Sequence, residues 1–443
     1  MRWAASGDRS RVMRVLTVSV VSLVAVVPML INWPVAVGVT SSSWSWKLAE
    51  GVKLTRIRYD TPREVRVLTI TPKAGPRVDL MTGASYLGPR RRTSSQGSTV
   101  ANNSVAGVNG DFGTAPGAPM HPLMVDGELW TTGSLAPGAV LAVRGDGTQA
   151  WVGRPSISMQ LLDVNGERAM WVSKWNAPRD TSSQVIGYTR RGGSLYTPDG
   201  ERKATSNDPQ WCAARLIPTN GFGWSGSERT AVIRSYRVKA QPEPCERKPL
   251  SLGTDPGAVV LAAKAGTVGG TKILSLNPGN RVKMRWALQG WPGVTDMVGG
   301  TPQVVDDGVN VGPPYDANDY LTDTHPRTGA GVSKGCSDTR LTTVCKIFFL
   351  TVDGRQAATG WSKGMRLPEL GAEFLKLKVW DAVNFDGGGS TTMWVRRKRN
   401  AYCKSYPSAG GCLVNHPPGP ERNVINGLAV LSGIDEATPT GLR

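Results

Sequence analysis

Residues 382–395 read Ala-Val-Asn-Phe-Asp-Gly-Gly-Gly-Ser-Thr-Thr-Met-Trp-Val, and this stretch decides how the rest of the sequence is interpreted. Apolar residues stand at both ends, and between them lie one carboxylate, three consecutive glycines and three hydroxyl residues. This pattern predicts a strand, a tight loop and a second strand. Three glycines in a row cost backbone entropy, so the loop is expected to need positive φ angles or a close approach to a ligand.

The glycine loop has two interpretations that the stretch alone leaves open. Successive backbone N–H groups in such a turn can form an anion-binding nest. The alternative is a glycine hairpin in which Asp386 only caps the turn. The loop lacks the lysine of a phosphate-binding P-loop. Ser390 also lacks the G-x-S-x-G frame of a hydrolase nucleophile.

Four further motifs occur in the chain around this loop, and together the five carry a family resemblance. They are Val108-Asn109-Gly110-Asp111-Phe112, His325-Pro326-Arg327-Thr328-Gly329, Val352-Asp353-Gly354-Arg355-Gln356 and Glu421-Arg422-Asn423-Val424-Ile425-Asn426-Gly427-Leu428. In this order they resemble the phosphodiester glycosidase family, over about residues 50–435. The resemblance implies cleavage of a sugar-1-phosphodiester at the glycosidic C–O bond, which releases the sugar and a phosphomonoester.

Such a reaction sets three requirements on the site. The departing phosphate must be held, the sugar must be oriented, and a carboxylate must stabilise the oxocarbenium-like centre or activate water. The resemblance therefore assigns catalytic roles to Asp386, Asp353 and Asp111. The residues expected to bind substrate are Asn109, Gly110, Arg327, Thr328, Arg355, Gly387, Gly388, Gly389, Ser390, Thr391 and Arg422.

Each assignment has a structural alternative. Asn109-Gly110 is also a common turn signal, and Arg327 is equally able to form a structural ion pair. Asp353 and Arg355 could pair within their own turn, and His325 beside proline is often a packing residue. Two further candidates, Glu421 and Arg422, are expected to line or brace the site. In Arg90-Arg91-Arg92, a solvated surface run competes with a phosphate contact.

The remaining pattern predicts a β-rich α+β fold with mixed sheets, few helices and a single catalytic domain. Strand alternation is clear over Lys53–Tyr59 and Val65–Ile70. The most apolar run, Lys346–Val352, is expected to be a central strand. A helix is predicted over Leu367–Leu375, since Pro368 suits a first turn, and Val424–Leu431 is predicted as a closing strand.

The chain divides into unequal parts. Residues 1–38 combine several arginines with an apolar run, which is typical of a signal peptide; an uncleaved membrane anchor is the alternative. We expect a lead-in over 39–50, the glycosidase-like domain over 51–435 and a tail over 436–443. Residues 197–255, rich in proline and charge, are predicted to be a loop-like insertion within that domain.

Six cysteines fall into three pairs that are close in sequence: Cys212/Cys245, Cys336/Cys345 and Cys403/Cys412. Six thiols permit 15 pairings, so spacing does not prove this one. An even count behind a signal-like segment favours disulfides in an oxidising compartment, outside the cytoplasm. A zinc site is the alternative, but no C-x-x-C spacing supports it.

A formal net charge of +18 suits an anionic partner. The expected partner is an anionic sugar phosphodiester or an envelope glycopolymer, without nucleic acid, and with membrane contact only through an uncleaved N-terminus. No cofactor or metal is required, although Asp353 and Asp386 could share a divalent cation. Two alternatives remain open: a non-catalytic module that binds anionic glycopolymers, and cleavage of the P–O bond.

Overall fold

The computed structural model describes residues 41–100, 103–134, 138–163, 165–178, 185–196, 210–219, 227–228, 231–240, 245, 251–313, 323–336, 344–396, 407–408 and 411–433. The predicted signal segment 1–38 and tail 436–443 lie outside these residues. Within the described ranges, no helix is long and apolar enough to cross a bilayer.

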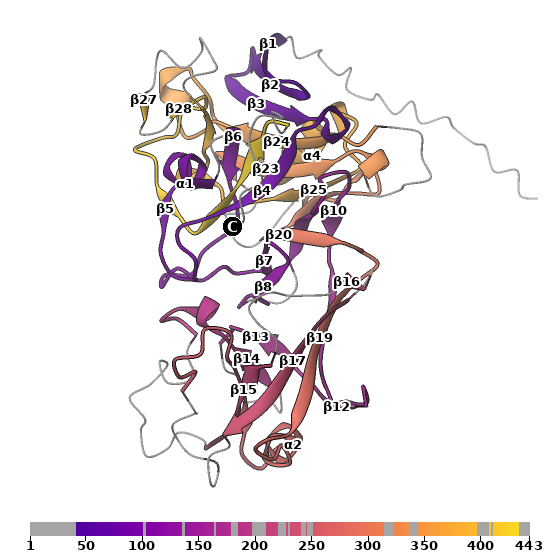
Figure 1. Ribbon diagram of the computed structural model, residues 1–443. Helices are drawn as coiled ribbons and strands as arrows, with labels where there is room; N and C mark the ends of the chain where they lie inside the picture. Colours follow the sequence, from indigo (N-terminus) through magenta and orange to yellow (C-terminus); the bar gives the residue numbers. More distant parts are fainter. Residues whose placement is uncertain are drawn as a thin grey trace, which may run out of the picture. The chain divides into compact units, whose positions relative to one another are not determined.

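An eight-stranded sheet carries the most apolar strand of the chain near its middle (Figure 1). All six residues of β24 are buried, because it lies between β3 and β23, so the predicted central strand is confirmed. In spatial order the sheet contains β1 (Ser41–Ala49), β2 (Val52–Tyr59), β3 (Arg63–Ile70), β24 (Ile347–Val352), β23 (Arg327–Val332), β25 (Asp381–Asn384), β21 (Gln303–Asp306) and β22 (Val309–Asn310). Most of the predicted lead-in is thus a strand: β1 pairs with β2 over its whole length.

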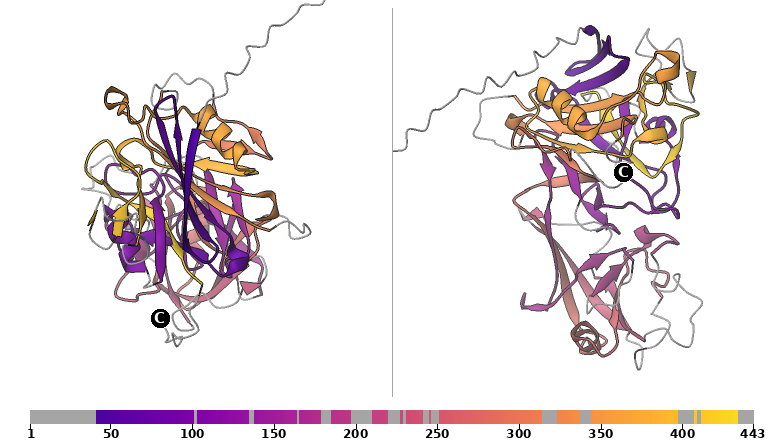
Figure 2. Two further views of the ribbon diagram at one scale, coloured as in Figure 1. Left: turned by 90° about the horizontal axis from the view of Figure 1, so that it is seen from above. Right: turned by 180° about the vertical axis from the view of Figure 1, so that it is seen from behind.

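The predicted helix is α4 (Leu367–Lys376), which covers one face of this sheet. Both views in Figure 2 show α4 lying against these strands. Its apolar side chains Leu367, Leu370 and Phe374 are fully buried in one cluster with residues of β3, β21 and β24. At its start the backbone N–H of Arg366 donates to Glu369 Oε2, which satisfies one group that the helix leaves open.

A six-stranded sheet receives the strand that follows the glycine loop. Its spatial order is β27 (Pro407–Ser408), β28 (Gly411–Leu413), β26 (Met393–Val395), β6 (Ser104–Asn109), β30 (Asn426–Leu431) and β4 (Arg77–Thr82). The predicted closing strand is therefore confirmed as β30. A two-stranded ribbon pairs β5 (Arg91–Arg92) with β29 (Asn423–Val424). Residues 93–100, for which the sequence predicted no element, form the helix α1 (Thr93–Val100).

Two further sheets complete the fold. The five-stranded sheet contains β10 (Ala150–Gly153), β9 (Ala139–Arg144), β20 (Val294–Gly300), β7 (Leu123–Val125) and β8 (Glu128–Thr131). The nine-stranded sheet contains β12 (Arg168–Trp171), β11 (Ser156–Leu162), β19 (Arg281–Gln289), β17 (Ala231–Ala240), β15 (Trp211–Pro218), β18 (Val259–Lys264), β14 (Ile186–Tyr188) and β13 (Lys174–Trp175), with β16 (Ser227–Glu228) beside β17. The helix α2 (Val268–Leu274) packs on β15 and β18.

The predicted insertion is more ordered than its composition suggested. Of residues 197–255, β15 and β17 lie inside the nine-stranded sheet and pair with each other and with β18 and β19. Proline and charge had favoured a loop, but strand pairing and the buried Trp211, Ala213 and Leu216 override that composition. The disulfide Cys212–Cys245 is formed, as predicted.

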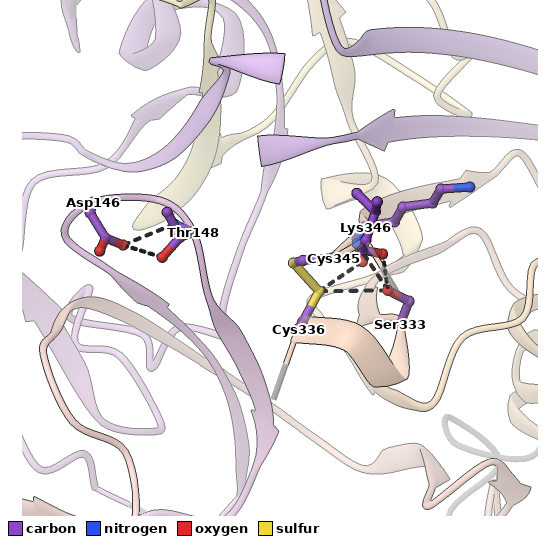
Figure 3. The surroundings of a disulfide bond; sticks show 7 residues. Asp146, Thr148, Ser333, Cys336, Cys345 and Lys346 are labelled. Carbon is purple, nitrogen blue, oxygen red and sulfur yellow. Dashed lines mark hydrogen bonds between the residues drawn. A yellow bond between two sulfur atoms is a disulfide. The ribbon is translucent and has the colours of Figure 1, made fainter. Parts of the chain in front are cut away.

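A second predicted disulfide, Cys336–Cys345, joins the ends of β23 and β24 (Figure 3). Beside it the backbone N–H of Lys346 donates to Ser333 Oγ over 2.9 Å, which closes the same turn. Cys412 is also disulfide-bonded, but its predicted partner Cys403 lies outside the described residues. The disulfide Cys336–Cys345 therefore links the two strands of the hairpin formed by β23 and β24, as the sequence predicted.

The fold class is confirmed as β-rich α+β. Among the described strands, β13 and β14 form a parallel pair, whereas the neighbours in the other sheets run antiparallel. Short single-turn 3-10 helices punctuate the connections. They are η1 (Pro72–Ala74), η2 (Arg190–Gly192), η3 (Lys334–Cys336), η4 (Ala357–Thr359) and η5 (Gly388–Ser390).

Candidate active site

The glycine loop crosses from one sheet to another. β25 before it belongs to the eight-stranded sheet, and β26 after it belongs to the six-stranded sheet. The interpretation as a closed glycine hairpin is therefore excluded, because the two flanking strands do not pair with each other. Between them η5 makes one tight turn, in which the N–H of Ser390 donates to the oxygen of Gly387.

Each glycine of the loop has a steric reason to lack a side chain. A Cβ on Gly387 would lie 2.8 Å from the oxygen of Pro326. Gly388 has φ +60°, and a Cβ there would press on the guanidinium of Arg355. A Cβ on Gly389 would lie 2.5 Å from Nε of Arg422. The loop lacks side chains because Pro326 and two arginines of this chain lie directly against it, and Gly388 has the positive φ angle that the sequence predicted.

Asn109, at the end of β6, holds the loop in place. Its Nδ2 donates to the backbone oxygen of Asp386 over 2.7 Å. Its Oδ1 accepts from the N–H of Thr392 and from Thr328 Oγ1. One fully buried amide therefore joins three of the sequence motifs. The alternative of a simple Asn-Gly turn does not hold, since β6 continues into a buried segment rather than a hairpin.

A pocket of about 240 Å³ opens over this loop. Its lining combines the loop with three distant segments, near residues 90, 111 and 422, and with Arg355. The lining residues are Arg90, Asp111, Gly113, Arg355, Asp386, Gly387, Gly388, Gly389, Ser390, Arg422, Asn423, Val424 and Ile425. Four of the five motifs, those around positions 110, 354, 386 and 422, thus contribute residues to one pocket, whereas no residue of the motif around Arg327 lines it.

Asp386 is one of the two carboxylates that line the pocket. Burial raises its pKa to about 6, a hydrogen bond from Ser390 opposes the shift, and the negative charge of Asp111 adds to it. The positive charges of Arg422 and Arg90 lower the same pKa. A carboxylic acid that titrates close to neutrality is suited to proton transfer at ordinary pH.

Asp111 is the second carboxylate that lines the pocket, and both of its oxygens contact His121, which does not line the pocket. Its Oδ1 lies 2.6 Å from Nδ1 of His121, and its Oδ2 accepts the backbone N–H of His121 over 2.9 Å. Both side chains are about 98% buried or more. Nothing in the sequence marked His121 as a site residue, because it is a single histidine outside the five motifs.

Three arginines give the pocket its positive charge. Arg355 adopts the left-handed region with φ +60°, which non-glycine residues seldom occupy, and this turns its side chain over Gly388. Arg90 donates to the backbone oxygen of Thr114. Arg422 lies over Gly389. Forked guanidinium groups bind phosphate oxygens well, so this lining suits an anionic group.

Hydrogen bonds join the segments that carry Arg90 and Arg422. Glu421 accepts hydrogen bonds from both the backbone N–H and the hydroxyl of Ser94, at 2.8 and 2.7 Å. The ribbon of β5 and β29 adds backbone pairing between the same segments. Of the two expected roles for Glu421, the structure therefore supports bracing.

Several predicted site residues do not line the pocket. Asp353 is buried and its carboxylate binds Arg66, the indole of Trp361 and the backbone N–H of His416. It is a structural carboxylate, whose pKa burial raises while Arg66 lowers it. The expectation that Asp353 acts on substrate is corrected for this reason.

Arg327 also departs from its predicted role. It is 1% exposed, and its guanidinium donates to the backbone oxygens of Met365 and Asp323. Its motif supports the glycine loop through the backbone, since the N–H of Gly388 donates to the oxygen of Pro326, the residue before Arg327. Gly110 and Thr328 likewise bind the loop without lining the pocket, and Thr391 is fully buried.

The anion nest expected from the loop is only partly available. The N–H groups of Gly388 and Ser390 already donate to backbone oxygens within the fold. His325 lies beside the pocket, with its Nδ1 3.4 Å from Arg355 Nε. Burial lowers the pKa of His325, and the charges of Arg327 and Arg355 lower it further, which favours the neutral ring.

A shared cation between Asp353 and Asp386 finds no geometric support, because only Asp386 lines the pocket. The described residues do contain a cluster of three carboxylates close enough to hold an ion: Asp79, Asp126 and Asp296. Burial, followed by the charge of Asp79, raises the pKa of Asp296 to about 7. None of the three lines the pocket.

The family model for phosphodiester glycosidases matches residues 240–431, which include Arg355, Asp386 and Arg422. Residues 240–431 are therefore similar to the phosphodiester glycosidase family. The resemblance expected from the sequence motifs is thereby confirmed. No curated protein matches the sequence.

Solved structures resemble this chain over most of its length. A hypothetical protein from Synechocystis is similar with a TM-score of 0.61 and 14% identity, over 86% of this chain and 62% of that one. This chain therefore spans less than two thirds of the Synechocystis protein. A putative exported protein from Burkholderia pseudomallei gives 0.58 and 19%, over 89% and 97%. The catalytic domain of zebrafish N-acetylglucosamine-1-phosphodiester alpha-N-acetylglucosaminidase gives 0.39 and 12%, over 91% and 85%.

The phosphodiester glycosidase match covers only part of the pocket. Arg90 and Asp111 lie before residue 240, and they reach the pocket from the loop before α1 and the segment after β6; His121, which binds Asp111, also lies before residue 240. Both carboxylates and all three arginines are therefore present only when the two halves of the chain fold together.

Proposed function

We propose that the protein is a hydrolase that cleaves a sugar-1-phosphodiester at its glycosidic C–O bond. One observation carries the proposal: two carboxylates, Asp386 and Asp111, share a small pocket with three arginine side chains. Phosphodiester binding needs the positive charge, and glycoside cleavage needs the carboxylates. The family of residues 240–431 supports the same chemistry.

In this mechanism the phosphate group lies against Arg90, Arg355 and Arg422, which offset its charge as the C–O bond breaks. A phosphomonoester is already a good leaving group, so a strong general acid matters less than for an ordinary glycoside. The ionised Asp386 serves the anomeric carbon, either as nucleophile or as the base that activates water. Asp111, which hydrogen bonds to His121 hold in place, supplies a second carboxylate beside the bound sugar.

We further propose that the protein acts outside the cytoplasm on an envelope glycopolymer or glycolipid. The two complete disulfides of the described residues support an oxidising compartment. The basic and apolar N-terminal sequence supports export. The net charge of +18 would favour association with an anionic polymer.

The test is incubation of the purified protein with alkyl esters of N-acetylglucosamine 1-phosphate and glucose 1-phosphate. Release of free sugar by the wild type, and none by Asp386→Asn, is the expected result. In water labelled with oxygen-18, the label should enter the sugar. Label in the phosphate would show P–O cleavage instead, and binding without turnover of any ester would show a non-catalytic module.

A further inference from the structure

A second and larger hollow lies on the nine-stranded sheet, away from the residues of the active-site pocket. Its volume is about 660 Å³. Three neighbouring strands, β15, β17 and β19, supply most of its lining, and the turn before β18 supplies Asp255. None of its lining residues lines the pocket around Asp386.

Strand alternation places the cationic side chains of this hollow on one face. On β17, Ser235, Arg237 and Lys239 alternate with the buried Tyr236 and Val238. On β19, Arg281 and Lys283 likewise alternate with the buried Val282. Four basic side chains from two adjacent strands therefore project to the same side of the sheet.

The strand register brings like charges directly opposite each other. Arg237 pairs with Arg281, and Ser235 pairs with Lys283 one step along the ladder. Like charges in such positions destabilise a sheet. Within the described residues none of the four basic side chains forms an ion pair, and Asp255 is the one acid in the lining. A bound anion would relieve this repulsion.

We propose that this hollow is a second, non-catalytic site that binds a segment of an anionic polysaccharide carrying phosphodiester groups. The cationic row consists of Arg237, Lys239, Arg281 and Lys283. The hollow, at about 660 Å³, has the volume of pockets that bury a drug-sized ligand, which is larger than a single small anion. The choice of phosphodiester polymer rests on the proposed function, since the same chain would then hold its substrate at two places.

Nucleic acid fits this surface less well. Single-stranded nucleic acids are held by aromatic side chains on which bases stack, in addition to positive charge. The aromatic residue of the lining, Tyr236, is 1% exposed and points to the other face of the sheet. The hollow thus has basic side chains that could bind the phosphates of a nucleic acid but no exposed aromatic side chain on which a base could stack.

The experiment measures binding of a fluorescein-labelled poly(N-acetylglucosamine 1-phosphate), in which phosphodiester groups join the sugars through their anomeric carbons, to the full chain by anisotropy. The variant Arg237→Ser/Lys283→Ser removes two charges from the cationic row. A matched control, Lys73→Ser/Lys272→Ser, removes two exposed charges elsewhere. We expect the Kd to rise at least tenfold for the first variant and less than twofold for the control. The dependence of Kd on salt should also weaken only in the first variant.

Failure of this site can be distinguished from failure of the proposed function. Turnover of a short alkyl sugar phosphate should not change in Arg237→Ser/Lys283→Ser, because neither residue lines the active-site pocket. Polymer binding without any turnover would leave the second site standing and reject the enzyme. Equal Kd values for the variant and its control, or tighter binding of a single-stranded DNA of equal charge, would reject the second site.

A stability measurement guards against a misfolded variant. Because the substitutions remove like-charge repulsion, Tm without polymer should stay the same or rise. The single variant Lys239→Ser changes one exposed side chain and provides a milder test. It should weaken polymer binding about threefold or more, and no weakening in either variant would count against the proposal.

Discussion

The side chain of Asn109 donates to the backbone oxygen of Asp386 over 2.7 Å, although the two residues are 277 positions apart in the chain. The N–H of Asp386 in turn donates to the oxygen of Gly110. The strand β6 therefore sets both where the loop of Asp386 lies and which way its carboxylate faces. Asn109 does not line the pocket, so it acts as a positioning residue.

Replacing Asn109 by alanine should remove three hydrogen bonds and leave their buried partners unsatisfied. We expect a loss of about 3–5 kcal/mol in the free energy of unfolding, measured by urea denaturation. Asn109→Asp should be similarly unfavourable, since a carboxylate cannot donate to the oxygen of Asp386. The control Asn103→Ala loses one partly buried hydrogen bond, to Ser432, and should cost about 1 kcal/mol. Equal losses for Asn109→Ala and Asn103→Ala would contradict the anchoring role.

The pH dependence of activity should follow Asp386. With a pKa near 6 in the folded protein, the carboxylate is ionised at pH 7 and becomes protonated below pH 6. If the ionised form is the base or nucleophile, kcat/KM for an alkyl sugar phosphate should fall about tenfold for each pH unit below 6. A profile that is flat from pH 4 to 8 would exclude this role.

Asp386→Asn should make the protein inactive but more stable at neutral pH. The folded pKa, about 6, lies above the ordinary value of 3.8, so folding favours the protonated form. The stability from this group is fully present below about pH 4 and is lost as pH rises through 6. Asparagine removes that loss, and we expect a gain of about 2 kcal/mol at pH 7.5 that disappears at pH 4. Urea titrations at the two pH values measure it, and a variant less stable than wild type at pH 7.5 would contradict the prediction.

The bare loop can be tested with a matched pair of glycines. Gly389→Ala places a Cβ 2.5 Å from Nε of Arg422 and should displace that exposed side chain. We expect KM for a sugar phosphodiester to rise about tenfold, with less than about 1 kcal/mol of lost stability because the displaced group is flexible. Gly419→Ala, where no atom lies within 4 Å of the added carbon, is the control. An unchanged KM in Gly389→Ala would argue against phosphate binding by Arg422.

The disulfide Cys336–Cys345 should contribute stability without affecting catalysis. It closes a loop of 9 residues at the end of the hairpin where β23 ends and β24 begins. Arg327 and Val352, at the opposite end of the same hairpin, are the ones that lead toward the pocket. Cys336→Ser/Cys345→Ser should lower the free energy of unfolding by about 2–3 kcal/mol. The kcat/KM of the folded variant should match that of wild type. A large drop in kcat/KM would show that the disulfide end of the hairpin affects the active-site pocket.

Local pattern was enough to predict several elements of the fold. The central strand β24, the helix α4 and the strands flanking the glycine loop follow from apolar runs, a first-turn proline and turn residues. The strands β15 and β17 were missed because they lie within residues 197–255, whose overall charge and proline content is that of a loop. Their order comes from neighbouring strands that the local sequence does not show.

Side-chain direction at the site was harder to predict. Asp353 and Arg355 are two residues apart, yet only Arg355 reaches the pocket, since its left-handed backbone departs from strand alternation. Arg327 was expected to bind phosphate, but backbone oxygens of Met365 and Asp323 surround its guanidinium. His121 carries no motif, and its pairing with Asp111 follows only from the folded chain.

The crossing of the glycine loop between two sheets has a practical consequence for anyone who trims this protein. A fragment cut to residues 240–431 would keep Asp386 but lose β6 and β4, two of the six strands of the sheet that receives β26. Such a fragment would expose the unpaired edge of β26 and invite aggregation rather than report a weak enzyme. Expression work therefore has to retain the chain from β1 onward.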